Sequence, residues 1–129
     1  MKFLSILICW CFLQSSFAAT YSISPTGNDD SGNGSISKPW RTLFKATSVV
    51  TTAGDIIHVH EGMYTETQQI VLAVGVSIEG EGITSVIKST LTSDWTALLL
   101  LQSPEGTPGN QHISFLKFDG QNGSTYWAI

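Results

Sequence analysis

The most informative stretch of this chain is Gly54-Asp55-Ile56-Ile57-His58-Val59-His60-Glu61-Gly62-Met63-Tyr64. It places a run of β-forming residues between two glycine turns, and successive side chains of a strand point to opposite faces. Ile57 and Val59 therefore share one face, and His58 and His60 share the other. This alternation predicts a strand at 56–60 whose apolar residues enter a core and whose two histidines face solvent.

The composition is that of one globular domain or part of one. The chain has 129 residues, of which 42% are hydrophobic and 12% charged, a balance that favours a packed core over disorder. Its formal net charge is −4, and its six basic residues are scattered. Nucleic-acid binding requires clustered lysine and arginine, so we expect no nucleic-acid partner.

The N-terminus has the layout of a signal peptide at residues 1–18. Lys2 precedes an apolar run from Phe3 to Leu13, and small or polar residues follow up to a cleavage position after Ala18. The run is too short to span a bilayer, so we expect no membrane span in the mature chain; an uncleaved anchor is the alternative. We therefore expect a secreted protein, extracellular or at the cell surface, with the periplasm as a further compartment that fits.

Both cysteines, Cys9 and Cys11, lie in this predicted signal peptide. The mature chain, residues 19–129, would therefore have no disulfide and no cysteine ligand for zinc. Its stability must then come from packing and hydrogen bonding.

One helix is predicted before the strand at 56–60. Thr42 can cap it, Gly54 follows its end, and apolar residues recur between them at helical spacing. These residues are Leu43, Ala46, Val49 and Val50. A helix over 42–53 is too short to be stable alone, so its apolar stripe must dock on other elements.

The polar loop at 26–35 does not fit an EF-hand. Counted from Asp29, the twelfth position is Trp40, where a bidentate glutamate would be required. The Asn, Asp, Gly and Ser residues of this loop instead indicate a surface loop built of turns.

Short strands are predicted along the rest of the chain, with no further helix. They cover 21–24, 56–60, 69–74, 76–79, 85–89, 97–102, 113–119 and the start of another at 126–129. Several are apolar on both faces, and no two-residue Asn-Gly or Asp-Gly turn joins adjacent strands. Both features favour parallel sheets over hairpins.

A weak internal repeat supports stacked strands. Val76–Gly80 aligns with Leu116–Gly120 as apolar, polar, apolar, acidic and glycine, and 57–60 can be laid under both, with Val59 at the position of Ile78. Such a repeat predicts a β-solenoid whose coils lie about 4.8 Å apart. A β-sandwich is the alternative architecture.

Three blocks of sequence, in their order and spacing, resemble the opening of secreted right-handed parallel β-helix proteins of the pectin-lyase-like superfamily. The blocks are Tyr21–Asp29, Lys38–Ala46 and Gly54–Tyr64. The resemblance implies an all-β fold, a right-handed parallel β-helix (solenoid) with an N-terminal capping α-helix. Residues 19–129 would form the cap and the first coils, and the chain would be truncated at its C-terminus, because family members carry many coils.

The same resemblance implies an extracellular protein active on polysaccharide, a lyase or a hydrolase acting on an acidic polymer. The alternative is a non-catalytic surface adhesin or glycan-binding β-solenoid. Enzyme and binding protein stay open at this point, because the fold is shared by both. Catalytic residues of an enzyme would lie mostly beyond Ile129.

Glu79 and Asp119 are the candidate substrate-binding or calcium-binding residues. In the repeat alignment they occupy the same outward position on successive coils. A bound Ca²⁺ would relieve their repulsion and bridge to an acidic sugar, an arrangement that resembles pectate lyases. Ca²⁺ is the one cofactor we expect, and solvated surface positions are the alternative interpretation.

Lys117 is the candidate base for β-elimination from a uronate polymer. It lies two residues before Asp119, on the same predicted face, and such a reaction needs a base to take the C5 proton. A solubilising lysine is the alternative. Trp95, Tyr126 and Trp127 could stack on sugar rings or pack at coil edges.

His58 and His60 are weak candidates for metal ligands. Their spacing on one strand face suits a metal, but only Glu61 lies near them in the sequence as a third ligand. Polar rings at exposed strand positions explain the pair more simply, so the sequence assigns no metal site.

Overall fold

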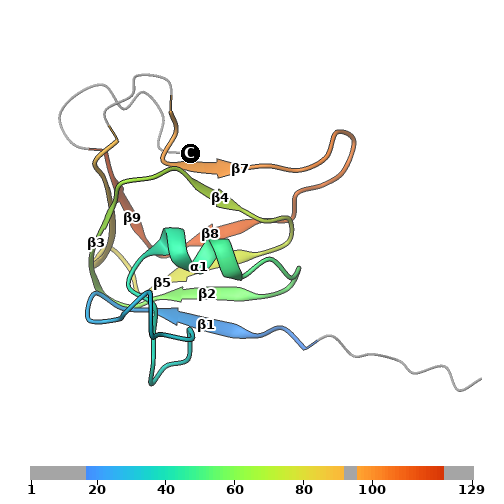
Figure 1. Cartoon of the computed structure of the whole chain (residues 1–129). Helices are drawn as coiled ribbons and strands as arrows, with labels where there is room; N and C mark the ends of the chain where they lie inside the picture. Colours follow the sequence, from blue (N-terminus) through green and yellow to red (C-terminus); the bar gives the residue numbers. More distant parts are fainter. Residues whose placement is uncertain (1–16, 92–95, 121–129) are drawn as a thin grey trace, which may run out of the picture.

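The structure is a computed structural model and describes residues 17–91 and 96–120 (Figure 1). In chain order its elements are β1 (Thr20–Ile23), α1 (Leu43–Val49), β2 (Ile56–Val59), β3 (Gly62–Glu66), β4 (Ile70–Leu72), β5 (Ser77–Gly80), β6 (Ser85–Ser89), β7 (Leu99–Leu101), β8 (His112–Ser114) and β9 (Lys117–Asp119). Most of the predicted signal peptide and all of the predicted strand at 126–129 lie outside the described residues.

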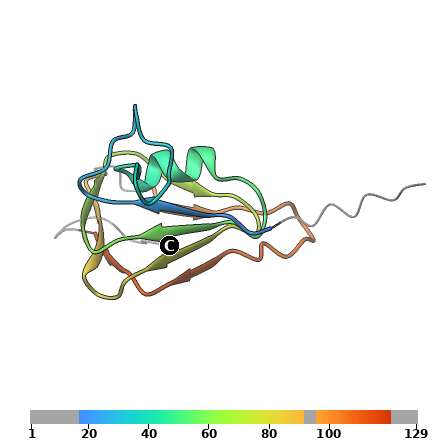
Figure 2. The ribbon, with the colours of Figure 1, turned by 90° about the horizontal axis from the view of Figure 1, so that it is seen from below.

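The strands form three sheets, and neighbouring strands in each sheet are parallel. The sheets have the orders β1-β2-β5-β8, β3-β6-β9 and β4-β7. Successive strands enter the three sheets in a constant order. One strand of each sheet is supplied in turn by β2, β3 and β4. The same order is repeated by β5, β6 and β7, and it begins again with β8 and β9. In Figure 2 the strands of the four-stranded sheet lie one beside the next, from blue β1 to orange-red β8. The predicted all-β character and parallel pairing are confirmed.

Apolar side chains line the interior and meet in register across neighbouring strands. Ile57 pairs with Ile78, and Ile78 pairs with Ile113. Ile57, Val59 and Ile78 have no exposed surface. Burial of one such side chain stabilises a fold by about 1.5–3 kcal/mol, so this ladder is a main source of stability. The prediction that Ile57 and Val59 face the core is confirmed.

Helix α1 packs against β4, β1 and β3, at the β1 end of the stack (Figures 1 and 2). Thr42 is its N-cap and accepts a hydrogen bond from the Lys45 N–H, as predicted. The helix ends at Val49, earlier than predicted, and the buried stripe contains Thr47 where the sequence suggested Val49, which is 48% exposed. Within the described residues, no helix has the length and apolarity needed to cross a membrane.

The loop between β1 and α1 pairs with the free edge of β1. The Ser22 N–H donates to the Gly34 carbonyl, and the Trp40 N–H donates to the Ser22 carbonyl. Trp40 is buried, stacks on Tyr21 and donates its indole N–H to Gly32. An edge strand with unpaired backbone groups invites aggregation, and this loop satisfies those groups.

Two strand predictions are wrong. Gly62–Glu66 forms β3, where the sequence indicated a turn; Gly62 has φ 135°, so the chain turns at this one residue and β3 begins at once. The strand predicted at 113–119 is two strands, β8 and β9. Phe115, with φ 55°, ends the first and directs the chain into another sheet.

The predicted repeat alignment is also wrong. Val59 pairs with Gly80, and Ile57 takes the place beside Ile78, a shift of two residues. Ile78 then pairs with Ile113 of β8, and not with a residue of β9. A shift of two preserves the alternation of inward and outward side chains, so the sequence pattern alone does not distinguish the two registers.

Candidate metal centre

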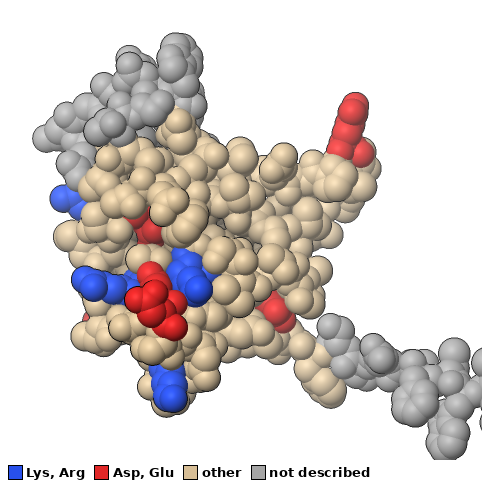
Figure 3. Space-filling model, in the orientation of Figure 1, with Lys and Arg blue, Asp and Glu red and all other residues tan. Residues whose placement is uncertain are grey.

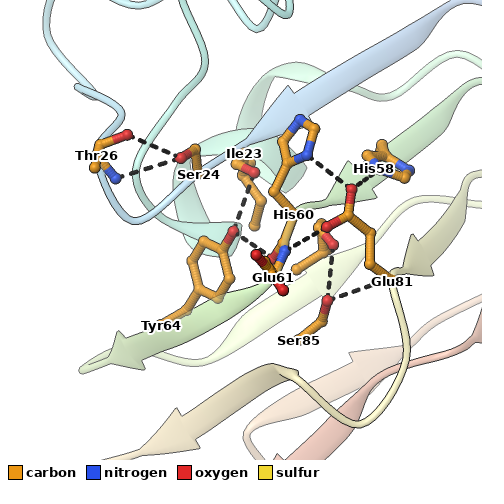
Figure 4. Close-up of polar contacts among 10 residues, drawn as sticks. Ile23, Ser24, Thr26, His58, His60, Glu61, Tyr64, Glu81 and Ser85 are labelled. Carbon is orange, nitrogen blue, oxygen red and sulfur yellow. Dashed lines mark hydrogen bonds and ion pairs between the residues drawn. The ribbon is translucent and has the colours of Figure 1, made fainter.

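Two histidines and a glutamate meet on the outward side of the four-stranded sheet, where β2 ends (Figure 4). His58 Nε2 lies 3.1 Å and His60 Nδ1 lies 2.9 Å from Glu81 Oε1. The two imidazole rings meet edge to face, with centroids 4.8 Å apart. One ligand atom from each of the three residues lies within 4.8 Å of the other two. This cluster, His58–His60–Glu81, is the centre of the candidate site.

Glu81 reaches the histidines from the turn that follows β5. Val59 of β2 pairs with Gly80 of β5. The residues that follow them, His60 and Glu81, therefore lie side by side. A Cβ on Gly80 would collide with the carbonyl oxygen of Phe115, so the close approach of that backbone requires glycine at this position.

Hydrogen bonds hold the Glu81 side chain and its turn in place. The Glu61 N–H donates to Glu81 Oε2 at 2.7 Å. The Glu81 N–H donates to Ser85 Oγ, and the buried Ser85 hydroxyl donates to the Val59 carbonyl. Because a backbone donor takes Oε2, Oε1 is the oxygen that faces the two rings (Figure 4).

The charged form of the Glu81 carboxylate is stabilised. Its pKa falls to about 2, because it accepts hydrogen bonds from His58, the Glu61 N–H and His60. It is therefore ionised across the pH range in which an ordinary imidazole titrates, near 6.5. The side chains of His58, His60 and Glu81 are 31%, 28% and 36% exposed, so solutes can reach the cluster.

Tyr64 supports the cluster from the interior (Figure 4). Its hydroxyl lies 2.8 Å from the His60 carbonyl and 3.1 Å from the Ile23 carbonyl. Burial, and then the charge of Glu81, raise the pKa of Tyr64. The hydroxyl therefore stays protonated and acts as a hydrogen-bond donor to these carbonyl groups. This contact ties the end of β2 to the end of β1 and limits movement of His60.

The donor set determines what the cluster can bind. Two imidazole nitrogens and one carboxylate oxygen are ligands of open zinc sites and of other first-row transition ions. Ca²⁺ takes 6–8 oxygen ligands, so it does not match this set. An imidazole beside a carboxylate can also accept or donate a proton during catalysis.

The sequence identified both histidines of this cluster and missed the glutamate. Glu61, the third ligand suggested by proximity, contributes only its backbone N–H. Glu81 follows His58 and His60 by 23 and 21 residues, so only the pairing of β2 with β5 brings it near them. Continuing the true register one residue beyond Val59 and Gly80 would have found it.

The predicted stacking of Glu79 with Asp119 is wrong. Glu79 lies in β5 between His58 and Ser114, whereas Asp119 lies in β9 opposite Lys88, in another sheet. The error follows from the repeat alignment, which took β9 for the partner of β5. The two carboxylates therefore do not form the shared calcium position that the alignment suggested.

Lys117, the candidate base, lies in β9, the strand that also contains Asp119. It pairs with Val86 and is exposed. The possible sugar-stacking residues Trp95, Tyr126 and Trp127 lie outside the described residues.

A buried carboxylate occupies the start of α1. Glu66, the last residue of β3, is 1% exposed. Its two oxygens accept hydrogen bonds from the Leu43 N–H at 2.7 Å and the Phe44 N–H at 3.3 Å. These N–H groups belong to the first turn of α1, where backbone N–H groups have no hydrogen-bond acceptor within the helix. The sequence pattern does not predict this contact, because Gly62–Tyr64 is typical of a turn.

Asp29 binds the residues just before α1. Its Oδ1 accepts from the N–H groups of Arg41 and Thr42, and its Oδ2 accepts from the Thr42 hydroxyl at 2.8 Å. A groove of about 490 Å³ lies beside it. The groove is lined by Pro25, Asp29, Arg41, Thr42, Met63, Tyr64 and Thr65. On the face seen in Figure 3, side chains of both charges gather near the start of α1, and most of the remaining surface is uncharged.

Over residues 17–91 and 96–120, fold and site together define an all-β arrangement of parallel sheets with one short helix and a solvent-accessible cluster of metal-ligating side chains. The chain belongs to the family described as protein of unknown function (DUF1565), whose model matches residues 25–122. No curated protein and no solved structure matches the chain.

Proposed function

We propose that the three parallel sheets are the faces of a right-handed parallel β-helix, and that α1 and the loop before it cap its first coil. Three features support this proposal: the constant order in which the chain visits the sheets, the in-register apolar ladder, and the pairing of the β1 edge with the loop. Right-handed crossovers are the rule for parallel strands of one sheet. The relation to the pectin-lyase-like superfamily is part of this proposal.

We propose that the protein is exported and that its signal peptide ends at Ala18. The Ala19 N–H donates to Oδ1 of the buried Asp55 at 2.9 Å. Cleavage after Ala18 would convert this N–H into an α-ammonium group, so a charged pair would replace a neutral donor. We expect the secreted chain to begin at Ala19 by mass spectrometry. A chain that begins at Thr20, which would have lost this nitrogen, contradicts the proposal.

We propose that the function of the protein is to bind an extracellular acidic polysaccharide in the groove beside Asp29. The observation that carries the proposal is the groove itself, whose volume of about 490 Å³ is in the range of small-molecule sites. Arg41 lines it and is exposed, and a guanidinium group can bind a uronate carboxylate through two hydrogen bonds. Asp29 is engaged by three donors, which reduces its repulsion of an acidic ligand.

Cleavage of the bound polymer is the second form of this proposal. Lys117 is its candidate base, since it shares β9 with Asp119, the residue that pairs with Lys88 in the β3-β6-β9 sheet. Ca²⁺ would serve the lyase by neutralising a uronate carboxylate.

A binding assay with oligogalacturonate, alginate and an uncharged polymer tests the proposal. We expect the two acidic polymers to bind and Arg41→Gln to weaken their affinity about tenfold or more, the loss expected for a charge-assisted hydrogen-bonded pair. Lys38→Gln is the matched control, because Lys38 comes from the same loop but does not line the groove. Equal loss in both variants, or equal binding of the uncharged polymer, would contradict the assignment.

The same samples, with and without Ca²⁺, distinguish the two forms of the proposal. Ultraviolet absorbance from an unsaturated product, lost in Lys117→Ala, is expected of a lyase. A reducing-sugar assay detects a hydrolase. Binding with neither product supports the glycan-binding alternative.

A further inference from the structure

We propose that His58, His60 and Glu81 form a binding site for a first-row transition-metal ion. Zn²⁺ is the ion with which we test it. The site is separate from the groove beside Asp29, since none of its residues lines that groove. The proposal therefore does not rest on polysaccharide binding; Tyr64, which donates to the His60 carbonyl, is the residue that both regions share.

The distances within the cluster suit a small ion. Zinc lies about 2.0–2.2 Å from nitrogen and carboxylate ligands, so ligands at neighbouring tetrahedral corners are about 3.3–3.6 Å apart. His58 Nε2 and His60 Nδ1 are 3.1 Å and 2.9 Å from Glu81 Oε1. The three ligand atoms lie within 4.8 Å of one another, so rotation of the side chains would bring all three within bonding distance of one ion.

The surroundings of the cluster hold its ligands in place. The Glu61 N–H fixes Glu81 Oε2, the Ser85 hydroxyl holds the Glu81 backbone, and Tyr64 holds the His60 carbonyl. Hydrogen bonds of this kind orient metal ligands and raise metal affinity. The cluster is therefore more ordered than surface histidines and a glutamate on free side chains would be.

The number of ligands defines the type of site. Three protein ligands leave at least one coordination position for water or for a donor atom of a partner, as in zinc sites that bind substrate. The partial exposure of all three side chains lets that partner approach. A carboxylate or hydroxyl group of an extracellular molecule has the chemistry to fill this position.

Equilibrium dialysis of the full chain with Zn²⁺ tests the site. Cys9→Ser and Cys11→Ser are introduced in every sample, so that thiols do not bind the ion. We expect one Zn²⁺ per chain and a loss of affinity of about tenfold or more in His58→Ala, His60→Ala and Glu81→Gln. His112→Ala is the matched control, because His112 lies in β8 of the same sheet, outside the cluster.

The control decides between a built site and general surface binding. No bound Zn²⁺ in the parent chain, or equal weakening in His112→Ala and His58→Ala, would overturn the proposal. Circular dichroism of each variant reports whether it folds.

A measurement on the unsubstituted histidines covers the case in which a variant does not fold. In ¹⁵N NMR of the same parent chain, Zn²⁺ is expected to shift Nε2 of His58 and Nδ1 of His60 and to leave the His112 ring nitrogens unchanged. Shifts at His112 alone, or at none of the three, would contradict the site.

Discussion

Glu66 and Glu81 are two glutamates that receive similar numbers of hydrogen bonds and have opposite roles. Glu66 is buried, and its oxygens accept from backbone N–H groups of α1. Glu81 lies at the surface and accepts from two imidazole rings and one N–H. The donors to Glu66 are fixed parts of the helix backbone, so this side chain serves to hold the start of α1 in place. An imidazole nitrogen can bind a metal ion in place of its proton. The same ion could then bind the Glu81 carboxylate, so Glu81 can take part in binding a ligand.

Replacement of the two glutamates should separate these roles most strongly. Glu66→Ala leaves the Leu43 and Phe44 N–H groups without their acceptor, and we expect a loss of about 2–4 kcal/mol in the free energy of unfolding, measured in urea. Glu81→Ala should shift the urea midpoint far less, because its partners can bond to water. Equal shifts would show that both glutamates serve the fold.

Asp29→Ala should have an intermediate effect. It removes an acceptor for the Arg41 and Thr42 N–H groups and for the Thr42 hydroxyl, just before the helix begins. We expect a loss of about 1–2 kcal/mol in unfolding free energy, similar to that of a helix cap. Asp30→Ala, at the exposed neighbouring residue, is the control and should change little. The assignment fails if the two variants are equally stable.

The pH dependence of stability gives a smaller effect that is specific to Glu66. Burial is the main cause that raises the pKa of Glu66 above its ordinary 4.5, against the two N–H donors that lower it, and Asp29 also raises it. Between the ordinary and the raised pKa the folded chain holds a proton that the unfolded chain has lost, so stability falls as pH rises.

Urea unfolding of the natural chain and of Glu66→Gln from about pH 4 to 8 measures the pH-dependent contribution of Glu66 to the free energy of unfolding. The stability of the natural chain relative to the variant should be highest at the acidic end and decline as pH rises through the raised pKa. A relative stability that stays constant or increases would contradict the direction of the shift.

The smallest effect on the fold is expected at the metal cluster. Glu81→Gln keeps the shape of the side chain and should leave the urea midpoint, without added metal, as close to the parent as His112→Ala does. With Zn²⁺ in excess, the parent and His112→Ala should gain thermal stability and Glu81→Gln should gain less, because an ion that binds only the folded state stabilises it. Equal gains in all three chains would exclude Glu81 from the site.

The outward and inward faces of β2 were predictable from sequence, and so was the capped start of α1. Their signals are local: alternation along four residues, and Thr42 placed before an apolar stripe. Strand β3 was not predictable in this way. Its residue Glu66 points inward, where a charged side chain is rare. Glu66 is accommodated there because it accepts hydrogen bonds from a helix more than twenty residues earlier in the chain.

Local sequence patterns predict the all-β character, the parallel pairing, the inward residues Ile57 and Val59 and the two outward histidines. They do not predict which strand lies beside which, or in what register. Strand side chains repeat every two residues, so a shift of two keeps every apolar residue inward, and only packing against the rest of the fold distinguishes the registers. Packing selected the register in which Val59 pairs with Gly80, and that choice brought Glu81, and not Asp119, to the candidate site.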